Sequence, residues 1–439
     1  MVQPKSEQPQ LGWQQFLFLF PAQGCVGTQR EIALEEMNFM WDKLKIKLKD
    51  RTHALKEWLQ KPKNLAGLGV GAVLFAGLIA WGVWINQPVE GQVPTSASQM
   101  AYDKAVVTAV LSDDAQPDED AEGKRVGTQE LEIKILTGAH KDEIMTLTNP
   151  MSALFNVDLD KGDQVIVRIM TDDEGSYYPS LFNYDRGIVL GVFVLIFFVL
   201  LAVLGGKKGM GALAGLIFTL ACIWFILIPS IIRGLPAIPV TVAMVAVTAA
   251  GALVQLNGFS QKTLCSVLGC VIGVVVAGGI AALVGTITPM NGFNMPEAEN
   301  LILYGADQGL KISGLLVCGV LISALGAVMD VALGIASSVW ELKEQNPRLT
   351  AGELFRSGMH IGRDAMGTMA NTLILAFAGS SFNMLILVQT YDIPFLQLIN
   401  TDYICIEIIQ SIAGAMGILL CVPIVALISA RMMAGRKGV

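Results

Sequence analysis

A single aspartate, Asp330, interrupts a long apolar stretch, residues 312–338, that carries no other charged side chain. A carboxylate at membrane depth is costly unless it faces water or a partner, so such residues usually mark an ion or substrate pathway. Small residues surround it, and they allow neighbouring helices to approach closely. Two interpretations are open: Asp330 takes part in binding or coupling, or it is a structural aspartate that hydrogen-bonds locally or snorkels toward the membrane surface.

A second polar stretch, residues 357–372, leads directly into the next apolar segment and contains Arg363, Asp364, Asn371 and Thr372. Polar groups at the start of a helix inside a membrane need partners or water. Arg363 and Asp364 either form a gate pair near the membrane aspartate or an ion pair without function at the cytoplasmic face. The spacing of Thr350 and Glu353 predicts a capping box at the start of a helix before this stretch.

Ser380 and Ser381 follow a glycine in the middle of the apolar segment 368–388. A polar, flexible centre is typical of the broken helices with which secondary transporters bind their substrates. The alternative is that these hydroxyls bond back to their own helix. The candidate residues of an ion or substrate pathway are therefore Asp330, Arg363, Asp364, Asn371, Thr372, Ser380 and Ser381.

The elements that must position these residues are membrane helices. Of the 439 residues, 53% are hydrophobic and 15% are charged, whereas a soluble domain has about 25% charged residues. This composition excludes a soluble enzyme, a nucleic-acid-binding protein and a disordered scaffold. A bilayer core needs about 20 apolar residues per helix. Eight stretches qualify: 65–85, 187–204, 209–232, 237–256, 264–287, 312–338, 368–388 and 408–428.

Basic residues indicate the orientation of these helices. With both termini in the cytoplasm, the segments on that side carry 17 of the lysines and arginines near the spans, and the short loops on the other side carry two. Such an excess follows the positive-inside rule. We therefore expect a multi-pass membrane protein with both termini cytoplasmic.

The long polar segment 86–186 then lies outside the cytoplasm. It contains 19 acidic and 8 basic residues, a net charge of −11. Apolar, β-rich runs at 105–111, 131–136, 144–147 and 165–170 predict a small barrel or sandwich of four or five strands. Tyr177, Tyr178, Phe182 and Tyr184 precede the second span, and we expect them to form an aromatic belt at the membrane interface.

The remaining segments complete the domain organisation. Residues 1–64 form a basic cytoplasmic segment, 65–85 the first span, 187–430 a seven-helix membrane domain and 431–439 a cytoplasmic tail. The first 36 residues look unrelated to the rest of the chain, so we expect translation to start at Met37 or Met40; a peptide from residues 5–30 of the natural protein would contradict this.

The sequence lacks the motifs of several enzyme classes. The three histidines are far apart and form no HExxH metalloprotease motif. An aspartyl protease needs two carboxylates in the membrane, and Asp364 would supply the second only if its loop folded inward. No P-loop or dinucleotide fingerprint is present, and the seven cysteines lack zinc-ligand spacing. We therefore expect no enzyme activity, no cofactor, no metal and no nucleic-acid partner.

The two polar stretches of the C-terminal half carry a family resemblance. The segments Ala-Leu-Gly-Ala-Val-Met-Asp at 324–330 and Ser-Gly-Met-His-Ile-Gly-Arg-Asp-Ala-Met-Gly-Thr-Met-Ala-Asn-Thr-Leu-Ile-Leu-Ala at 357–376 resemble the YibE/F-like family. From about residue 100 the similarity is looser, and residues 1–60 are not covered. The resemblance implies an integral membrane protein of bacteria, often described as a permease, without an established substrate.

Two functions are consistent with these observations. The first is a secondary transporter of an unknown small solute or ion, coupled to protons or sodium through Asp330. The second is a sensor, assembly or envelope-interaction protein that transports nothing and binds an envelope or membrane protein through its outer domain. Deleting residues 100–180 would abolish the second function and leave the first with partial flux.

Overall fold

The structure is a computed structural model that describes residues 76–77, 80–83, 85–87, 100–118, 123–171, 176–305 and 309–434. The predictions for the basic segment 1–64, for the start of translation and for most of the first span lie outside these residues. The same holds for most of the linker before residue 100 and of the C-terminal tail.

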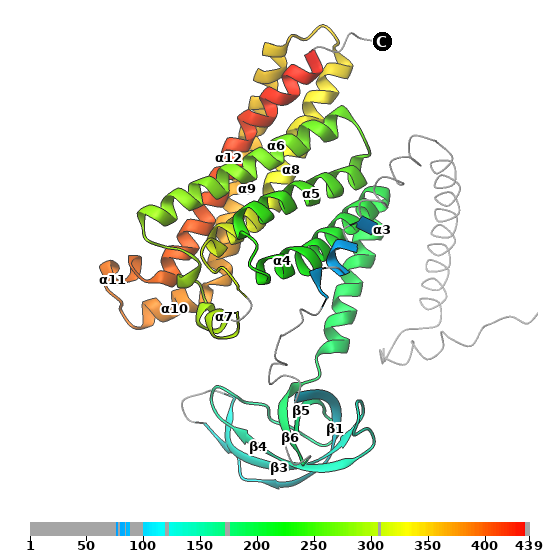
Figure 1. The fold of residues 1–439 in the computed structure, drawn as a ribbon, viewed down its shortest axis with the longest axis vertical. Helices are drawn as coiled ribbons and strands as arrows, with labels where there is room; N and C mark the ends of the chain where they lie inside the picture. The colour runs from blue at the N-terminus through cyan, green and yellow to red at the C-terminus, as the bar shows by residue number, and fades with distance from the viewer. Residues whose placement is uncertain are drawn as a thin grey trace, which may run out of the picture. The chain divides into compact units, whose positions relative to one another are not determined.

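Residues 100–184 form a β domain made of one curved sheet (Figure 1). Its strands are β1 (Met100–Asp113), β2 (Gln116–Pro117), β3 (Arg125–Ile135), β4 (Ile144–Met151), β5 (Gln164–Thr171) and β6 (Tyr177–Tyr184). All pairs are antiparallel, in the order β2-β3-β1-β5-β6, with β4 on the other side of β3. Because β4 also contacts β6, the sheet curls into a half-barrel.

Alternating residues build the core of this domain. Val165, Val167 and Ile169 on β5 are buried together with Leu131 and Ile133 on β3, while the residues between them are more exposed. This alternation is the period-two pattern of a strand with one buried face, and it confirms the four strands predicted from the sequence.

Two strands were not predicted. The aromatic segment before the second apolar stretch forms β6, which pairs with β5 along its whole length, so its tyrosines are strand residues. Tyr184 packs against the β core, and Tyr177 pairs with Thr171 at the far end of β6. The sequence did not reveal this sheet pairing, and the aromatic belt at the membrane interface stays a prediction.

The rest of the described chain is helical. The long helices are α3 (Gly187–Cys222), α5 (Ala237–Asn257), α6 (Gln261–Ile287), α8 (Leu315–Gln345), α9 (Ala351–Ser380) and α12 (Asp402–Ala434). The shorter elements are η3 (Ile223–Leu227), α4 (Ile228–Ile232), η4 (Gly292–Asn294), α7 (Ala298–Gly305), α10 (Phe382–Thr390) and α11 (Phe395–Ile399). Within the described residues, five helices are long and apolar enough to cross a membrane, or six if the bent pair α9–α10 is one span.

The eight expected spans are therefore not all found. The first lies mostly outside the described residues, and the second and third belong to one helical segment, Gly187–Ile232. That segment of 46 residues would be about 69 Å long if straight. It is interrupted at Gly206, whose φ of 58° and ψ of −132° are not helical. A methyl group added at Gly209 would collide with the carbonyl oxygen of Leu201, so the chain folds back here.

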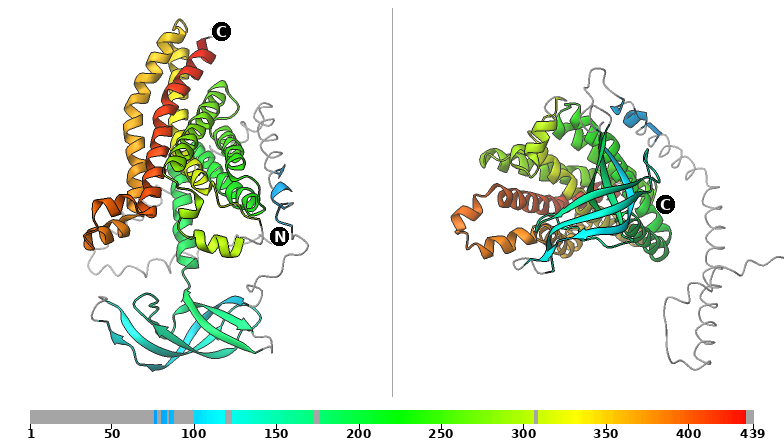
Figure 2. Two further views of the ribbon diagram at one scale, coloured as in Figure 1. Left: turned by 60° about the vertical axis from the view of Figure 1, so that its left-hand side comes forward. Right: turned by 90° about the horizontal axis from the view of Figure 1, so that it is seen from below.

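α12 lies at the centre of the bundle. It contacts α6, α8 and α9, which lie beside it in Figures 1 and 2. Glycines allow this close packing: Gly362 of α9 lies directly against Val422 of α12, and Gly417 of α12 lies against Ala277 of α6. The predicted capping box at the start of α9 is confirmed, with Thr350 and Glu353 each bonded to the backbone of the other.

Described residues at the end of the first expected span, 65–85, and directly after it lie against the π-helix η3. The Nδ2 atom of Asn86 donates to the carbonyl oxygen of Phe225 at 3.2 Å, and Gly82 allows a close approach to the same carbonyl. Arg233 donates to the carbonyl oxygen of Gln87 at 2.7 Å. The carbonyl oxygen of Phe225, within an irregular helix turn, thus accepts from a side chain of another segment.

Candidate functional site

Asp330 lies on an exposed face of α8. The opposite face, which includes Val328, Val331 and Ile335, is buried in the bundle core. Among the described residues, no side chain forms a hydrogen bond or an ion pair with the Asp330 carboxylate. Gly326 and Gly334, one turn away on either side, have no neighbouring atom within 4 Å of an added methyl group. This face of the helix is therefore open around the carboxylate.

The open face continues along α8 as a line of small residues. Gly319, Ser323, Gly326 and Asp330 follow one another at intervals of four, three and four residues, which is the spacing of one helix face. At one end of this line, the Nε2 atom of Gln410 on α12 lies 3.1 Å from the position of a Cβ at Gly319. The line from Gly319 to Asp330 spans 11 residues, about 16 Å.

Arg363 and Asp364 are also exposed, on α9. No described side chain pairs with either of them, so neither the gate pair nor the ion pair at the cytoplasmic face is formed, and neither residue bonds to Asp330. Asp330 and Arg363 nevertheless lie at similar distances from the connection between α8 and α9. Asp330 lies 15 residues before the end of α8, and Arg363 lies 12 residues after the start of α9. At 1.5 Å per residue these distances are about 22 and 18 Å.

Three other candidates are exposed on α9. The hydroxyl of Thr372 donates to the carbonyl oxygen of Thr368 at 2.8 Å, and that of Ser380 donates to the carbonyl oxygen of Phe377 at 2.7 Å. Both hydroxyls thus bond back to their own helix, which is the local alternative considered for Ser380. Asn371 makes no side-chain hydrogen bond with a described residue.

Ser381 marks a break in the helix. It is buried between α9 and α10, whose axes meet at 62°, and its hydroxyl accepts a hydrogen bond from Tyr403 of α12 at 3.2 Å. The bend bears out the prediction of a discontinuous helix at this position. Tyr403 was not identified from the sequence.

Glu407 lies one turn after Tyr403 on the same face of α12. Its Oε2 atom is buried and has no hydrogen-bond partner, whereas the sequence analysis did not include it among the site residues. An unsatisfied buried polar atom is costly. Tyr403, Glu407 and Gln410 are spaced i, i+4 and i+7, so their shared helix face could have been recognised in the sequence; the burial of the oxygen could not.

The candidate pathway thus has two polar regions. One consists of Ser381, Tyr403, Glu407 and Gln410 beside the break between α9 and α10. The other is Asp330, three helical turns along α8 from Gly319, which Gln410 approaches. Among the described residues, no group of three or more potential metal ligands is present.

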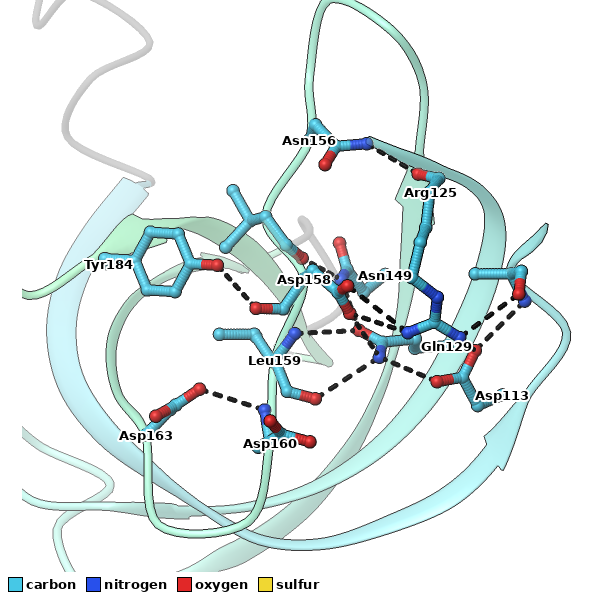
Figure 3. A network of polar contacts seen from close by, with 12 residues as sticks. Asp113, Arg125, Gln129, Asn149, Asn156, Asp158, Leu159, Asp160, Asp163 and Tyr184 are labelled. Carbon is cyan, nitrogen blue, oxygen red and sulfur yellow. Dashed lines mark hydrogen bonds and ion pairs between the residues drawn. The ribbon is translucent and has the colours of Figure 1, made fainter. Parts of the chain in front are cut away.

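A third polar cluster belongs to the β domain and differs in character (Figure 3). Gln129, which is 1% exposed, bonds to Asn149, to Leu159 and to two aspartates. The pKa of Asp113 lies below its usual range, because the Ala115 N–H and the Arg125 and Gln129 side chains donate to it. Each polar side chain of this cluster bonds to at least one other member, so the cluster joins the strands and loops that carry these residues.

Comparison with known families covers most of the chain. The model of the YibE/F-like protein family matches residues 193–435, and that of the YibE/F family N-terminal domain matches residues 100–181. Neither a curated protein nor a solved structure matches this chain. The two matched regions contain the helical bundle with Asp330 and the β domain, respectively. The chain therefore belongs to the YibE/F-like family of proteins, with the family's N-terminal domain preceding its apolar helices.

Proposed function

We propose that this protein is a secondary transporter of a small solute or ion, coupled to protons or sodium through Asp330. The observation that carries the proposal is the unpaired carboxylate on the open face of α8, in the middle of an apolar helix. A carboxylate at such a position needs a proton, a cation or water. Coupling of solute transport to this proton or cation would account for a costly carboxylate at this position.

The polar region around Glu407 supports the same function. Its unpartnered Oε2 atom offers an acceptor to a proton or cation, and it lies one turn from Gln410, which reaches the line of small residues leading to Asp330. The bend at Ser381 lies beside it. Broken helices of this kind bring backbone groups to the binding sites of transporters.

We also propose that the protein lies in the bacterial plasma membrane with both termini in the cytoplasm. The excess of basic residues on that side of the spans supports this orientation. It places the β domain and the Glu407 region on the opposite side. Labelling of single cysteines at Tyr178 and Glu344 with a membrane-impermeant maleimide tests it: the first should react in intact cells and the second only after lysis.

The deciding experiment compares cells that carry the wild-type protein, a deletion or Asp330→Asn at matched expression. Ions and small metabolites inside and outside the cells are measured by mass spectrometry. We expect one solute to shift in the deletion and Asp330→Asn to reproduce that shift. Glu344→Gln is the matched control, because Glu344 is an exposed carboxylate near the end of the same helix, and it should behave as wild type.

The opposite outcome has a clear meaning. If Asp330→Asn handles every solute as the wild type does, Asp330 does not couple transport. If the deletion itself shifts no solute, transport is excluded under the tested conditions, and a sensor or assembly function that acts through the β domain becomes the better proposal.

A further inference from the structure

The loop after β4 exposes two large apolar side chains at its tip. Leu154 is 90% exposed and Phe155 is 79% exposed, while the next most exposed large apolar side chain in the described β domain, Ile144, is 62% exposed. The residues on either side behave differently, since Met151 and Leu159 are buried. The segment between Met151 and Leu159 thus departs from the core for a few residues only, and it exposes Leu154 and Phe155 to solvent.

Hydrogen bonds close this loop. The N–H of Ser152 donates to the carbonyl oxygen of Phe155 at 2.9 Å, and the N–H of Phe155 donates to the hydroxyl of Ser152 at 3.1 Å. Asn156 donates to the carbonyl oxygen of Ser152 at 3.2 Å and to that of Arg125 at 2.6 Å. The tip is therefore held in a fixed shape, which reduces the entropy lost when it binds something.

The paired polar cluster of the β domain holds the base of the loop (Figure 3). The Asn149 side chain donates to the carbonyl oxygen of Val157, and the N–H of Leu159 donates to Gln129. Arg125 donates to the carboxylate of Asp158 at 3.0 Å. A buried network of this kind specifies one arrangement of the segments that it joins. Here it fixes the direction in which the tip projects.

The strand order shows which end of the domain carries the tip. β4 and β6 run in the same direction, because each is related to β1 by two successive antiparallel pairings. Their C-terminal ends therefore point in the same direction, with β6 ending opposite Ala105 of β1 and β4 ending farther along, beyond Asp113. β4 leads there into the loop, and β6 leads through Asp185 and Arg186 into α3. The hydroxyl of Tyr184, the last residue of β6, donates to the carbonyl oxygen of Asp158.

We propose that this apolar tip, residues 152–156, inserts Leu154 and Phe155 into the interfacial layer of the lipid bilayer. Its end of the β domain continues after two residues into α3, whose first half is an exposed apolar helix. Lipid is favoured over a protein partner because residues 151–156 carry no charge and because α3 keeps this end next to the membrane. Aromatic and aliphatic side chains partition readily into the interface.

Photocrosslinking of the full chain in vesicles of phosphatidylethanolamine and phosphatidylglycerol tests this proposal. p-Benzoylphenylalanine replaces Phe155 in one protein and Tyr178 in the control. Tyr178 is an exposed aromatic residue near the opposite end of the same sheet. We expect lipid adducts, detected by mass spectrometry, in about tenfold higher yield at position 155 than at position 178, as burial of one large apolar side chain implies.

A pair of second substitutions sharpens the test. Leu154→Asp should lower the lipid-adduct yield at position 155 about tenfold, whereas Ile144→Asp, at the start of β4, should leave it unchanged. Equal lipid yields at positions 155 and 178 would overturn the proposal. So would adducts at position 155 that consist mainly of a second copy of the chain, of another segment of the same chain or of an added protein.

Discussion

In the β domain, Arg125 donates to two aspartates. The amide nitrogen of the buried Gln129 donates to an aspartate and to a carbonyl oxygen, and its amide oxygen accepts from Asn149 and from the Leu159 N–H. In the helical bundle, by contrast, the carboxylates of Asp330 and Glu407 have polar atoms without a described partner. Every ion pair between described residues lies in the β domain. The β domain thus pairs several of its charged groups, whereas these two carboxylates of the apolar bundle are in no described ion pair.

We interpret the paired polar groups of the β domain as structural and the unpaired carboxylates of the bundle as candidates for the proposed function. A paired cluster can be removed only with a loss of stability, because each remaining partner is left unsatisfied. An unpaired carboxylate on an open helix face contributes little to folding, and its presence in an apolar helix supports the proposed coupling role. The comparison can be tested by substitutions in both regions.

The largest effect on stability is expected for Gln129→Leu. The substitution leaves the Asn149 side chain and the Leu159 N–H without their acceptor in a buried site. We expect the free energy of unfolding of the β domain to fall by about 2–4 kcal/mol, measured by denaturant unfolding. Gln164→Leu, at an exposed position on β5, should change it by less than about 0.5 kcal/mol. Equal effects would contradict the structural importance of the cluster.

A smaller loss is expected where helices meet. A methyl group added at Gly362 would collide with Val422 of α12, so Gly362→Ala should destabilise the bundle by about 1–3 kcal/mol. Gly367 on the same helix has open space, and Gly367→Ala should be neutral or stabilising by up to about 1 kcal/mol. Thermal unfolding in detergent compares the two. A loss at Gly367 as large as that at Gly362 would show an unseen contact.

A still smaller effect should follow from pH in the β domain. The pKa of Asp142 lies below the usual 3.8, because Lys134 donates to its carboxylate and attracts its charge; Asp113 and Asp185 have lowered pKa values as well. A carboxyl group with a lowered folded-state pKa stabilises the fold above its unfolded-state pKa. This stability should therefore be lost as the pH falls below about 4. Asp142→Asn should make a pH series of melting temperatures less steep.

The smallest change in stability is expected for Asp330→Asn. Since no described group is bonded to this carboxylate, its free energy of unfolding should stay within about 0.5 kcal/mol of the wild type, although transport is expected to be lost. A decrease of more than about 1.5 kcal/mol would instead indicate a structural partner. Thermal unfolding of the same preparations used for transport gives both quantities on one protein.

The sequence predicted those elements that repeat a simple pattern. Alternation identified β5, and the pair Thr350 and Glu353 identified the start of α9. β6 was missed because tyrosines next to an apolar stretch also fit a membrane interface, and Pro179 weakens the strand pattern. β2 has only two residues, which is too short for any periodic signal.

The candidate site was predicted only in part for a related reason. The type of residue identified Asp330, and the glycine and serines identified the bend at Ser381. Which face of α8 is open depends on where its neighbouring helices pack, and the sequence of α8 alone does not contain that information. The burial of one oxygen of Glu407 likewise depends on several helices at once.

The central position of α12 has a consequence for how the bundle is made. Chains are synthesised from the N-terminus, so α6, α8 and α9 enter the bilayer before the helix that all three contact. Until α12 arrives, the surfaces that receive it, such as Gly362 of α9 and Ala277 of α6, face lipid or the insertion machinery. The core of the bundle is thus completed only after these helices have been inserted. A chain that ends before residue 402 keeps the contacts of α8 with α6 and α9, but it lacks the helix that packs against all three.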